Sequence, residues 1–443
     1  MWKTKIPYRL IDFSARIHPS GNWVIGVKRL SDVGGSGTWT WIDENDNALA
    51  LENGYFESHP SFKLKDVNLD GNEMVAIPKF YVKSDGNSRY WISPEPRDGF
   101  HVHPAFMSKG LEKKDTMIDV HGIERDNACI YIGKWQSWID YAMLLDSKPK
   151  MWSIPSFNED RIELFENIRG IQFNEQQKES LMHLQALYPT VDATYWDNWH
   201  AADAWNDHSP DGSINVVGYH MMNVWDWSAL QWLALIEGGT TNASLRFGEG
   251  YLEGKYLDTV DGDATMSANF HGIYGLWGNV WQWIQGVQTR YDGSLWIWDS
   301  IGNEIWKETG HVMPTRKSET AIWSEGENCG CWRQRLLASG WNFDTSDMFL
   351  PDTSSLVSDP IYGCFSDGIW CRTKSTSKHL YACAVGGSYD SGYWGGMFGW
   401  NFDLRLGTEI VKNGVLTEET RWTYPTVASR LCFAPQNLPG AGE

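Results

Sequence analysis

Few side chains in this 443-residue chain stand at the spacings that catalysis or metal binding requires. His101 and His103 could project from one face of a strand, and imidazoles are common zinc ligands. Pro104 follows directly, and no carboxylate or cysteine stands at ligand spacing. We therefore expect no metal site at these histidines.

Two acidic segments could also supply catalytic acids or bind a metal ion. Three aspartates, Asp258, Asp261 and Asp263, surround Gly262, which is more typical of a solvated turn than of paired catalytic acids. The segment 66–72 begins like a calcium loop, but its twelfth position is Ile77, where calcium needs a bidentate glutamate. We expect a hairpin turn at Asp70-Gly71 instead.

Signature motifs of enzymes are also missing. The sequence contains no G-x-x-x-x-G-K-[ST] loop, no H-E-x-x-H helix and no G-x-S-x-G elbow. Its seven cysteines cannot all pair within the chain, since the number is odd. Cys329 and Cys331 are close together, as are Cys364 and Cys371, but no second CxxC-type pair completes a zinc site. We expect buried free thiols, with no catalytic residue, no metal and no cofactor.

Two helices are expected to support the fold. Ser156 and Glu159 form a capping-box pattern before an apolar stripe that stops at Gly170. A second helix is expected from about Trp225 to Glu237, ending at the glycines 238–239. Its aromatic residues lie on several sides, so we expect it to be buried on most faces.

Strand-like runs at 23–27 and 38–42, and the short runs after residue 240, favour an α+β fold with few helices, short antiparallel strands and long irregular loops. We expect two parts: a β-rich N-terminal segment, 1–45, and a larger domain, 46–437.

No stretch of about 18 apolar residues suggests a membrane span, and the N-terminus lacks a signal peptide, which predicts synthesis in a cytoplasm. The net charge of −19 disfavours nucleic acid and anionic membranes as partners.

Two aromatic-rich segments carry more information than any catalytic pattern. The chain holds 27 tryptophans. In the segment 274–283, Trp281 and Trp283 alternate with polar residues, as on a strand, and we expect both indoles to be structural. In the segment 385–403, glycines separate Tyr, Trp, Phe and Met residues. That composition suits either a binding surface or a glycine-rich buried turn.

Together these segments resemble a known family. The run Gly278-Asn279-Val280-Trp281-Gln282-Trp283 is similar to the G-N-V-W-E-W strand of formylglycine-generating-enzyme-like proteins, which have a C-type-lectin-like fold. Gly386-Gly387-Ser388 and Ser429-Arg430-Leu431-Cys432-Phe433 resemble that family's closing G-G-S and G-F-R motifs. Four further runs, beginning at Val75, His103, Ile130 and Phe349, follow the order found in phage tail proteins of this fold. The resemblance covers residues from about 50 to 435 and extends to the tropism determinants that retroelements diversify.

The resemblance implies a virion adhesin, a tail-fibre or tail-tip protein that binds a host cell-surface receptor, either a glycan or an outer protein. It also implies other virion tail proteins as partners, a homotrimer, and a place in the virion tail. The implied receptor-binding residues are Tyr389, Asp390, Tyr393, Trp394, Met397, Phe398, Trp400, Asn401 and Asp403. By the same resemblance, the N-terminal segment could attach the chain to the particle.

The alternatives differ in chemistry. The related enzymes carry catalytic cysteines between the G-G-S and G-F-R motifs, whereas no cysteine stands between Ser388 and Leu431 in this chain. A formylglycine-generating oxidase is therefore disfavoured. A structural head or tail decoration protein without host binding is the main alternative.

Overall fold

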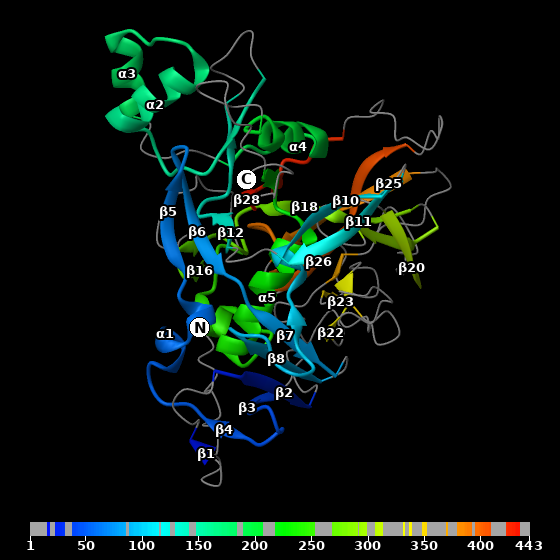
Figure 1. Ribbon diagram of the computed structural model, residues 1–443. Coiled ribbons are helices and arrows are strands. Elements are labelled where there is room, and N and C mark those ends of the chain that lie inside the picture. The colour runs from blue at the N-terminus through cyan, green and yellow to red at the C-terminus, as the bar shows by residue number, and fades with distance from the viewer. Residues whose placement is uncertain are drawn as a thin grey trace.

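The structure is a computed structural model. It describes residues 16–17, 23–31, 38–85, 88–114, 117–124, 129–140, 148–183, 189–206, 218–252, 268–290, 292–298, 306–312, 331–332, 336–338, 348–351, 369–370, 379–391, 395–408 and 422–434. Strands dominate these residues, and the helices are few (Figure 1). The α+β class expected from the sequence is confirmed.

An eight-stranded sheet forms the largest unit of the described residues. Its neighbours are antiparallel, except that β24 pairs with β26, and β27 with β18, in parallel. The strands, in spatial order, are β20 (Trp306–Val312), β19 (Ser294–Trp298), β18 (Trp281–Thr289), β25 (His379–Gly386), β26 (Gly396–Thr408), β24 (Ile369–Trp370) and β21 (Cys331–Trp332), with β27 (Val427–Ala428) beside β18.

Two five-stranded sheets complete the main framework. One has the order β3 (Thr38–Ile42), β2 (Ile25–Ser31), β8 (Arg89–Ser93), β7 (Tyr81–Ser84) and β9 (His101–Val102). The other has the order β15 (Tyr219–Met221), β28 (Leu431–Phe433), β12 (Cys129–Gly133), β6 (Asn72–Pro78) and β5 (Lys65–Leu69). The strands expected near 23–27 and 38–42 are thus confirmed as β2 and β3. They share a sheet with β8 of the larger expected domain.

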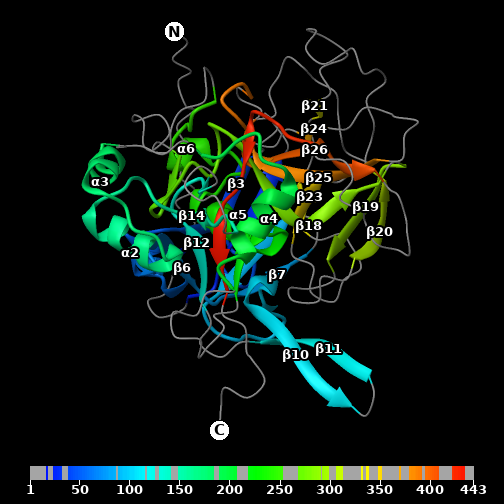
Figure 2. The same cartoon turned by 90° about the horizontal axis from the view of Figure 1, so that it is seen from above.

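Short pairs of strands make up the rest. They are β1 (Arg16–Ile17) with β4 (Leu49–Ala50), β10 (Met107–Lys114) with β11 (Met117–Glu124), β13 (Trp138–Ile139) with β14 (Met151–Trp152), β16 (Asn269–Phe270) with β17 (Ile273–Tyr274), and β22 (Leu336–Ala338) with β23 (Phe349–Pro351). The β10–β11 hairpin projects from the body of the molecule (Figure 2).

Helix α5 (Val224–Gly238) lies at the centre of the fold, in contact with β2, β8 and β18 (Figure 1). Every residue from Val224 to Glu237 is buried, which confirms a helix surrounded on nearly all faces. Asn223 caps its N-terminus, accepting from the Trp225 and Asp226 amides. Gly239, with φ of 58°, ends the helix as expected, because a left-handed C-cap favours glycine.

The other helices are shorter: α1 (Tyr55–Ser58), α2 (Glu159–Arg169), α3 (Glu175–Met182), α4 (Tyr195–Asp203), α6 (Ser244–Phe247), and the 3-10 turns η1 (Pro60–Phe62) and η2 (Pro104–Phe106). Helix α2 ends at the left-handed Gly170, as predicted. Its N-cap is Asn158, whose side chain accepts from the Arg161 amide, so the expected Ser156–Glu159 capping box is not used. Asparagine is as good an N-cap as serine, and it stands directly before the apolar stripe.

Two large hydrophobic clusters fill most of the interior of the described residues, and a small third one comprises Val24, Ile42 and Trp91. The α5 core surrounds that helix, and the second core lies beneath α2 and α4. Successive residues of β25 alternate between them: Ala382 and Ala384 join the second core, and Cys383 and Val385 join the α5 core. Because strand side chains alternate between the two faces of a sheet, the eight-stranded sheet separates the two cores.

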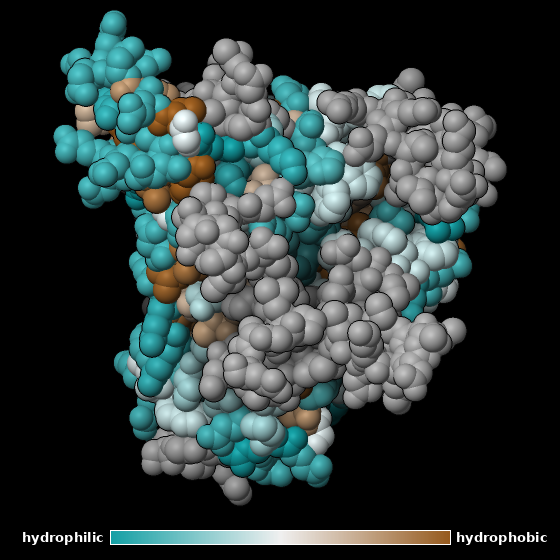
Figure 3. Space-filling model, turned by 45° about the horizontal axis from the view of Figure 1, so that its top comes forward, coloured by the Kyte–Doolittle hydropathy of each residue, from teal (hydrophilic) through white to brown (hydrophobic). Residues whose placement is uncertain are grey.

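The tight turn predicted at Asp70-Gly71 is confirmed. Asp70 and Gly71 both have positive φ, 51° and 84°, and join β5 to β6 as the predicted tight hairpin. In Figure 3, the coloured residues of the visible face are mostly hydrophilic, with apolar residues on the side that carries α2, α3 and β5. Among the described residues, no helix is long and apolar enough to cross a membrane.

Candidate functional site

The motifs that suggested a family lie next to one another in space. Strand β18, which begins at Trp281, pairs with β25 through Gln282 and Val385, and with β27 through Trp281 and Val427. The amide of Gly278 donates to the Gly386 carbonyl at 3.4 Å. Segments that are more than 100 residues apart in the sequence thus form one continuous arrangement.

Arg430 joins these motifs from inside the protein. Its guanidinium is fully buried and donates to Gln282 Oε1 at 2.8 Å, and to the carbonyls of Gly133 (2.6 Å), Tyr274 (2.8 Å) and Gly275 (3.0 Å). Burial lowers the pKa of Arg430 to about 9, so the group is charged at neutral pH. Because each of these acceptors sits on a different element or turn, Arg430 has a structural role.

The strand-like segment around Trp281 is structural, as predicted. Trp281 and Trp283 are 4% and 0% exposed and belong to the second core. Asn279 has φ of 61° and makes the turn before β18, donating from its amide nitrogen to Gln136 Oε1. A left-handed asparagine in a buried turn agrees with the expected turn at this position.

The glycine-rich segment begins with a tight turn at the surface. Gly386 and Gly387 have φ of 92° and 88°, and a side chain at either position would collide with backbone atoms. The Tyr389 amide donates to the Asn279 carbonyl at 2.9 Å, and Asp390 accepts from Ser388 Oγ. Tyr389 is half-buried and Asp390 is exposed, so the structure leaves both accessible at the end of β25.

The remainder of the segment corrects the expectation of a continuous contact surface. Met397, Phe398 and Trp400 are at most 1% exposed, and Asn401 is 8% exposed. They lie on β26, which has β25 on one side and β24 on the other, and the three apolar side chains belong to the α5 core. A strand inside a sheet that is covered on both faces has no free face, so these four side chains are not available to a receptor.

Three predicted residues remain. Asp403 is half-buried on β26, and its amide donates to Asn401 Oδ1 at 2.9 Å. Tyr393 and Trp394 lie outside the described residues, as do Asp258, Asp261 and Asp263.

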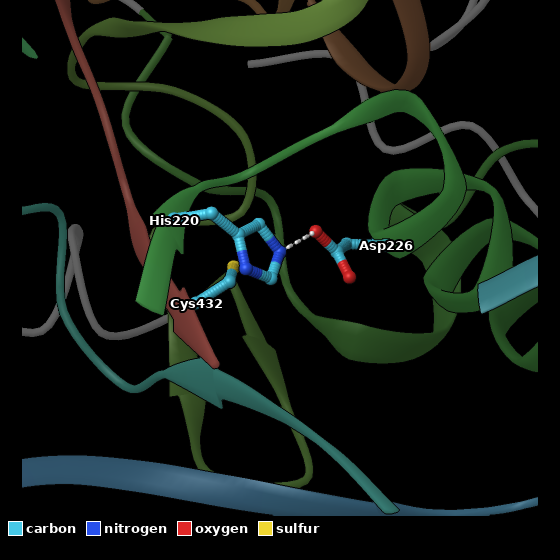
Figure 4. A group of neighbouring side chains, drawn as sticks. All are labelled: His220, Asp226 and Cys432. Carbon is cyan, nitrogen blue, oxygen red and sulfur yellow. Dashed lines mark hydrogen bonds and ion pairs between the residues drawn. The ribbon is translucent and has the colours of Figure 1, made fainter. Parts of the chain in front are cut away.

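A buried polar cluster that the sequence analysis did not find lies beside the closing motif. His220 on β15, Asp226 on α5 and Cys432 on β28 place their ligand atoms within 4.8 Å of one another (Figure 4). His220 and Cys432 are directly paired on neighbouring strands. His220 Nε2 lies 2.8 Å from Asp226 Oδ2, and that oxygen also accepts from the Asn223 amide.

The hydrogen bonds of this cluster indicate that His220, Asp226 and Cys432 have a structural role. His220 Nδ1 lies 2.8 Å from the Gly218 carbonyl, so both ring nitrogens already have hydrogen-bond partners within the protein. A metal ion or the Cys432 proton would have to displace one of these partners. Burial, and next the Asp226 carboxylate, raise the pKa of Cys432 well above its ordinary value, although Arg430 and the Gly133 backbone act in the opposite direction. The thiol is therefore neutral and poorly nucleophilic.

The other candidates from the sequence are placed apart. His101 is exposed on β9, whereas His103 is fully buried, caps η2 and lies 3.2 Å from Ser228 Oγ. The two imidazoles do not form one site. Among the described cysteines, Cys129, Cys383 and Cys432 are free, and the last two are buried, as expected.

No family model matches the chain, and no curated protein matches it either.

Proposed function

We propose that the chain is a virion adhesin, a tail-fibre or tail-tip protein that recognises a receptor on a host cell. The observation that carries this proposal is the turn 386–391, which is hydrogen-bonded to Asn279 before β18 and in which Asp390 is exposed and Tyr389 is half-buried. Loops on a rigid scaffold are the usual place for recognition. The C-type-lectin-like fold, the homotrimer and the location in the virion tail belong to this proposal.

The contact surface we propose is smaller than the sequence implied. It comprises Tyr389, Asp390 and Asp403, together with Tyr393 and Trp394 of the segment between β25 and β26. Tyrosine and tryptophan are the residue types that most often dominate binding energy, because they bring large rigid surfaces at low entropic cost. The buried residues of β26 belong to the scaffold and not to this contact surface.

The test is adsorption of purified, labelled protein to host cells. Tyr389→Ala and Asp390→Ala should each weaken adsorption by about fivefold or more if these side chains are anchors. Asp98→Ala removes an exposed carboxylate from the β8–β9 connection and serves as the matched control, with unchanged adsorption. Thermal melts of all three variants should coincide with that of the parent.

The same measurement distinguishes an adhesin from a structural virion protein. A parent protein that does not adsorb to any host that the virus infects, yet is incorporated into particles, would favour a structural head or tail protein. Adsorption that survives both substitutions would place the contact surface elsewhere on the chain.

A further inference from the structure

A cavity of about 260 Å³ opens beside helix α4, separate from the 386–391 turn. The polar side chains that line it are Lys148, Asp197, His200 and Asp203, and the apolar ones are Pro149, Ala201 and Ala204. Its volume is slightly below the roughly 300–1,000 Å³ of sites for drug-sized ligands, which suits a single ring.

Except for Lys148 and Pro149, the lining residues belong to α4 and its C-cap and lie on one side of that helix. At about 100° per residue, Asp197, Ala201 and Ala204 share one stripe, and His200 and Asp203 lie next to it. Trp196 does not line the cavity, because its half-buried ring packs against the second core. The small side chains Ala201 and Ala204 leave the space, and the polar ones surround it.

Both carboxylates keep hydrogen-bonding capacity among the described residues. Asp197 uses Oδ2 to accept from the Thr194 amide at 3.0 Å and from Thr194 Oγ1 at 2.7 Å, which leaves Oδ1 without a partner there. Asp203 uses Oδ1 to accept from Asn206 Nδ2 at 3.0 Å, and Oδ2 has no described partner. The helix cap holds Asp197 in position independently of any ligand.

The position of these groups excludes a single metal ion as occupant. Six residues of α-helix separate the two carboxylates by about 9 Å along the axis, whereas calcium and magnesium require oxygens within about 2.6 Å of one centre. Lys148 adds an ammonium at the same cavity, which opposes a cation further. Two carboxylates likewise oppose an anion.

We infer that this cavity binds one ring of a neutral sugar. Hydroxyls at opposite ends of such a ring can donate to Asp197 and Asp203 through bonds of about 2.8 Å, and Lys148 can donate to a ring or hydroxyl oxygen. The site goes beyond the proposed adhesin surface and does not depend on it.

The probe is a set of methyl glycosides of glucose, galactose, mannose and N-acetylglucosamine, observed by saturation-transfer NMR with the full chain. At least one should bind in the millimolar range, which corresponds to about −4 kcal/mol for a small, single site. Asp203→Asn removes one acceptor and should weaken that binding about fivefold to tenfold.

Glu179→Gln, on the exposed side of α3, removes the same charge away from the cavity and is the matched control. Binding by this variant should equal that of the parent. The inference fails if no glycoside binds the parent, if Asp203→Asn binds as well as Glu179→Gln, or if calcium alone competes with the glycoside. Loss of sugar binding with normal cell adsorption would leave the adhesin proposal intact.

Discussion

Strand β26 and helix α4 are both rich in aromatic residues, and they use them in opposite ways. On β26, Phe398, Trp400 and Phe402 are at most 1% exposed. On α4, Trp196 and Trp199 are half-buried beside charged groups. β26 has a strand on each side and a core on each face, whereas α4 packs on β14 and β15 through one side only. Aromatic composition thus predicts burial or contact only when the position in the fold is known.

The largest expected effect is on β26. Trp400→Ala leaves a cavity where a fully buried indole stacks on Phe402, with ring centroids 5.7 Å apart. We expect a loss of about 3–5 kcal/mol in the free energy of unfolding, measured by urea denaturation. If Trp400→Ala keeps the stability of the parent and loses only adsorption, Trp400 is a contact residue, and β26 does not differ from α4 in burying its aromatic side chains.

The next effect concerns the buried charge of Arg430, which joins β18 to β12 and to the end of β17. Arg430→Met fills similar space but leaves three carbonyls and the Gln282 amide without their donor, at a cost of about 3 kcal/mol or more. Arg246→Met, at an exposed position on α6, is the control and should change stability by less than about 0.5 kcal/mol. Equal stability of the two variants would show that Arg430 does not tie the motifs together.

An intermediate effect depends on pH. Burial, and to a lesser extent the charge of His101, lower the pKa of His103 well below 6.5 in the folded protein. Below pH 6.5 the unfolded chain therefore binds the extra proton, and stability falls as pH decreases towards the folded pKa, by up to about 1.4 kcal/mol per pH unit.

His103→Asn keeps an acceptor for the Ala105 amide and removes the titration. Between pH 7 and 5.5, the variant should lose roughly 1–2 kcal/mol less than the parent in urea denaturation. Parallel losses in the two proteins would mean that His103 is protonated in the folded state.

A small effect is expected on α4. Trp196→Ala removes a ring that is only partly covered. The free energy of unfolding should therefore fall by no more than about 1.5 kcal/mol relative to the parent. A loss as large as that for Trp400→Ala, measured in the same urea series, would place Trp196 in the core and remove the contrast between the two segments.

No effect is expected from a chelator. Both nitrogens of His220 are occupied, so EDTA should leave the melting temperature unchanged. Reductant should do the same, because Cys129, Cys383 and Cys432 are free. A fall of several degrees with either reagent would reveal a metal or a disulfide.

The sequence by itself determined the features that depend on neighbours within a few residues. The left-handed glycines at 170 and 239 end helices where the sequence places them, and Asp70-Gly71 makes the expected hairpin. The all-round burial of α5 followed from its apolar residues on every side. The shorter helix α4 was not expected, because nine residues rich in tryptophan carry little periodic signal or helix propensity.

Tertiary structure alone decided which aromatic residues are accessible and which polar residues meet. Trp400 is buried because β24 and β25 flank its strand, and neither neighbour is visible in the residues around position 400. His220 and Asp226 meet Cys432 from more than 200 residues away, and Lys148 reaches the cavity of α4 from a separate segment. Turn and cap chemistry is local, whereas burial and site geometry depend on strand order and on packing between distant segments.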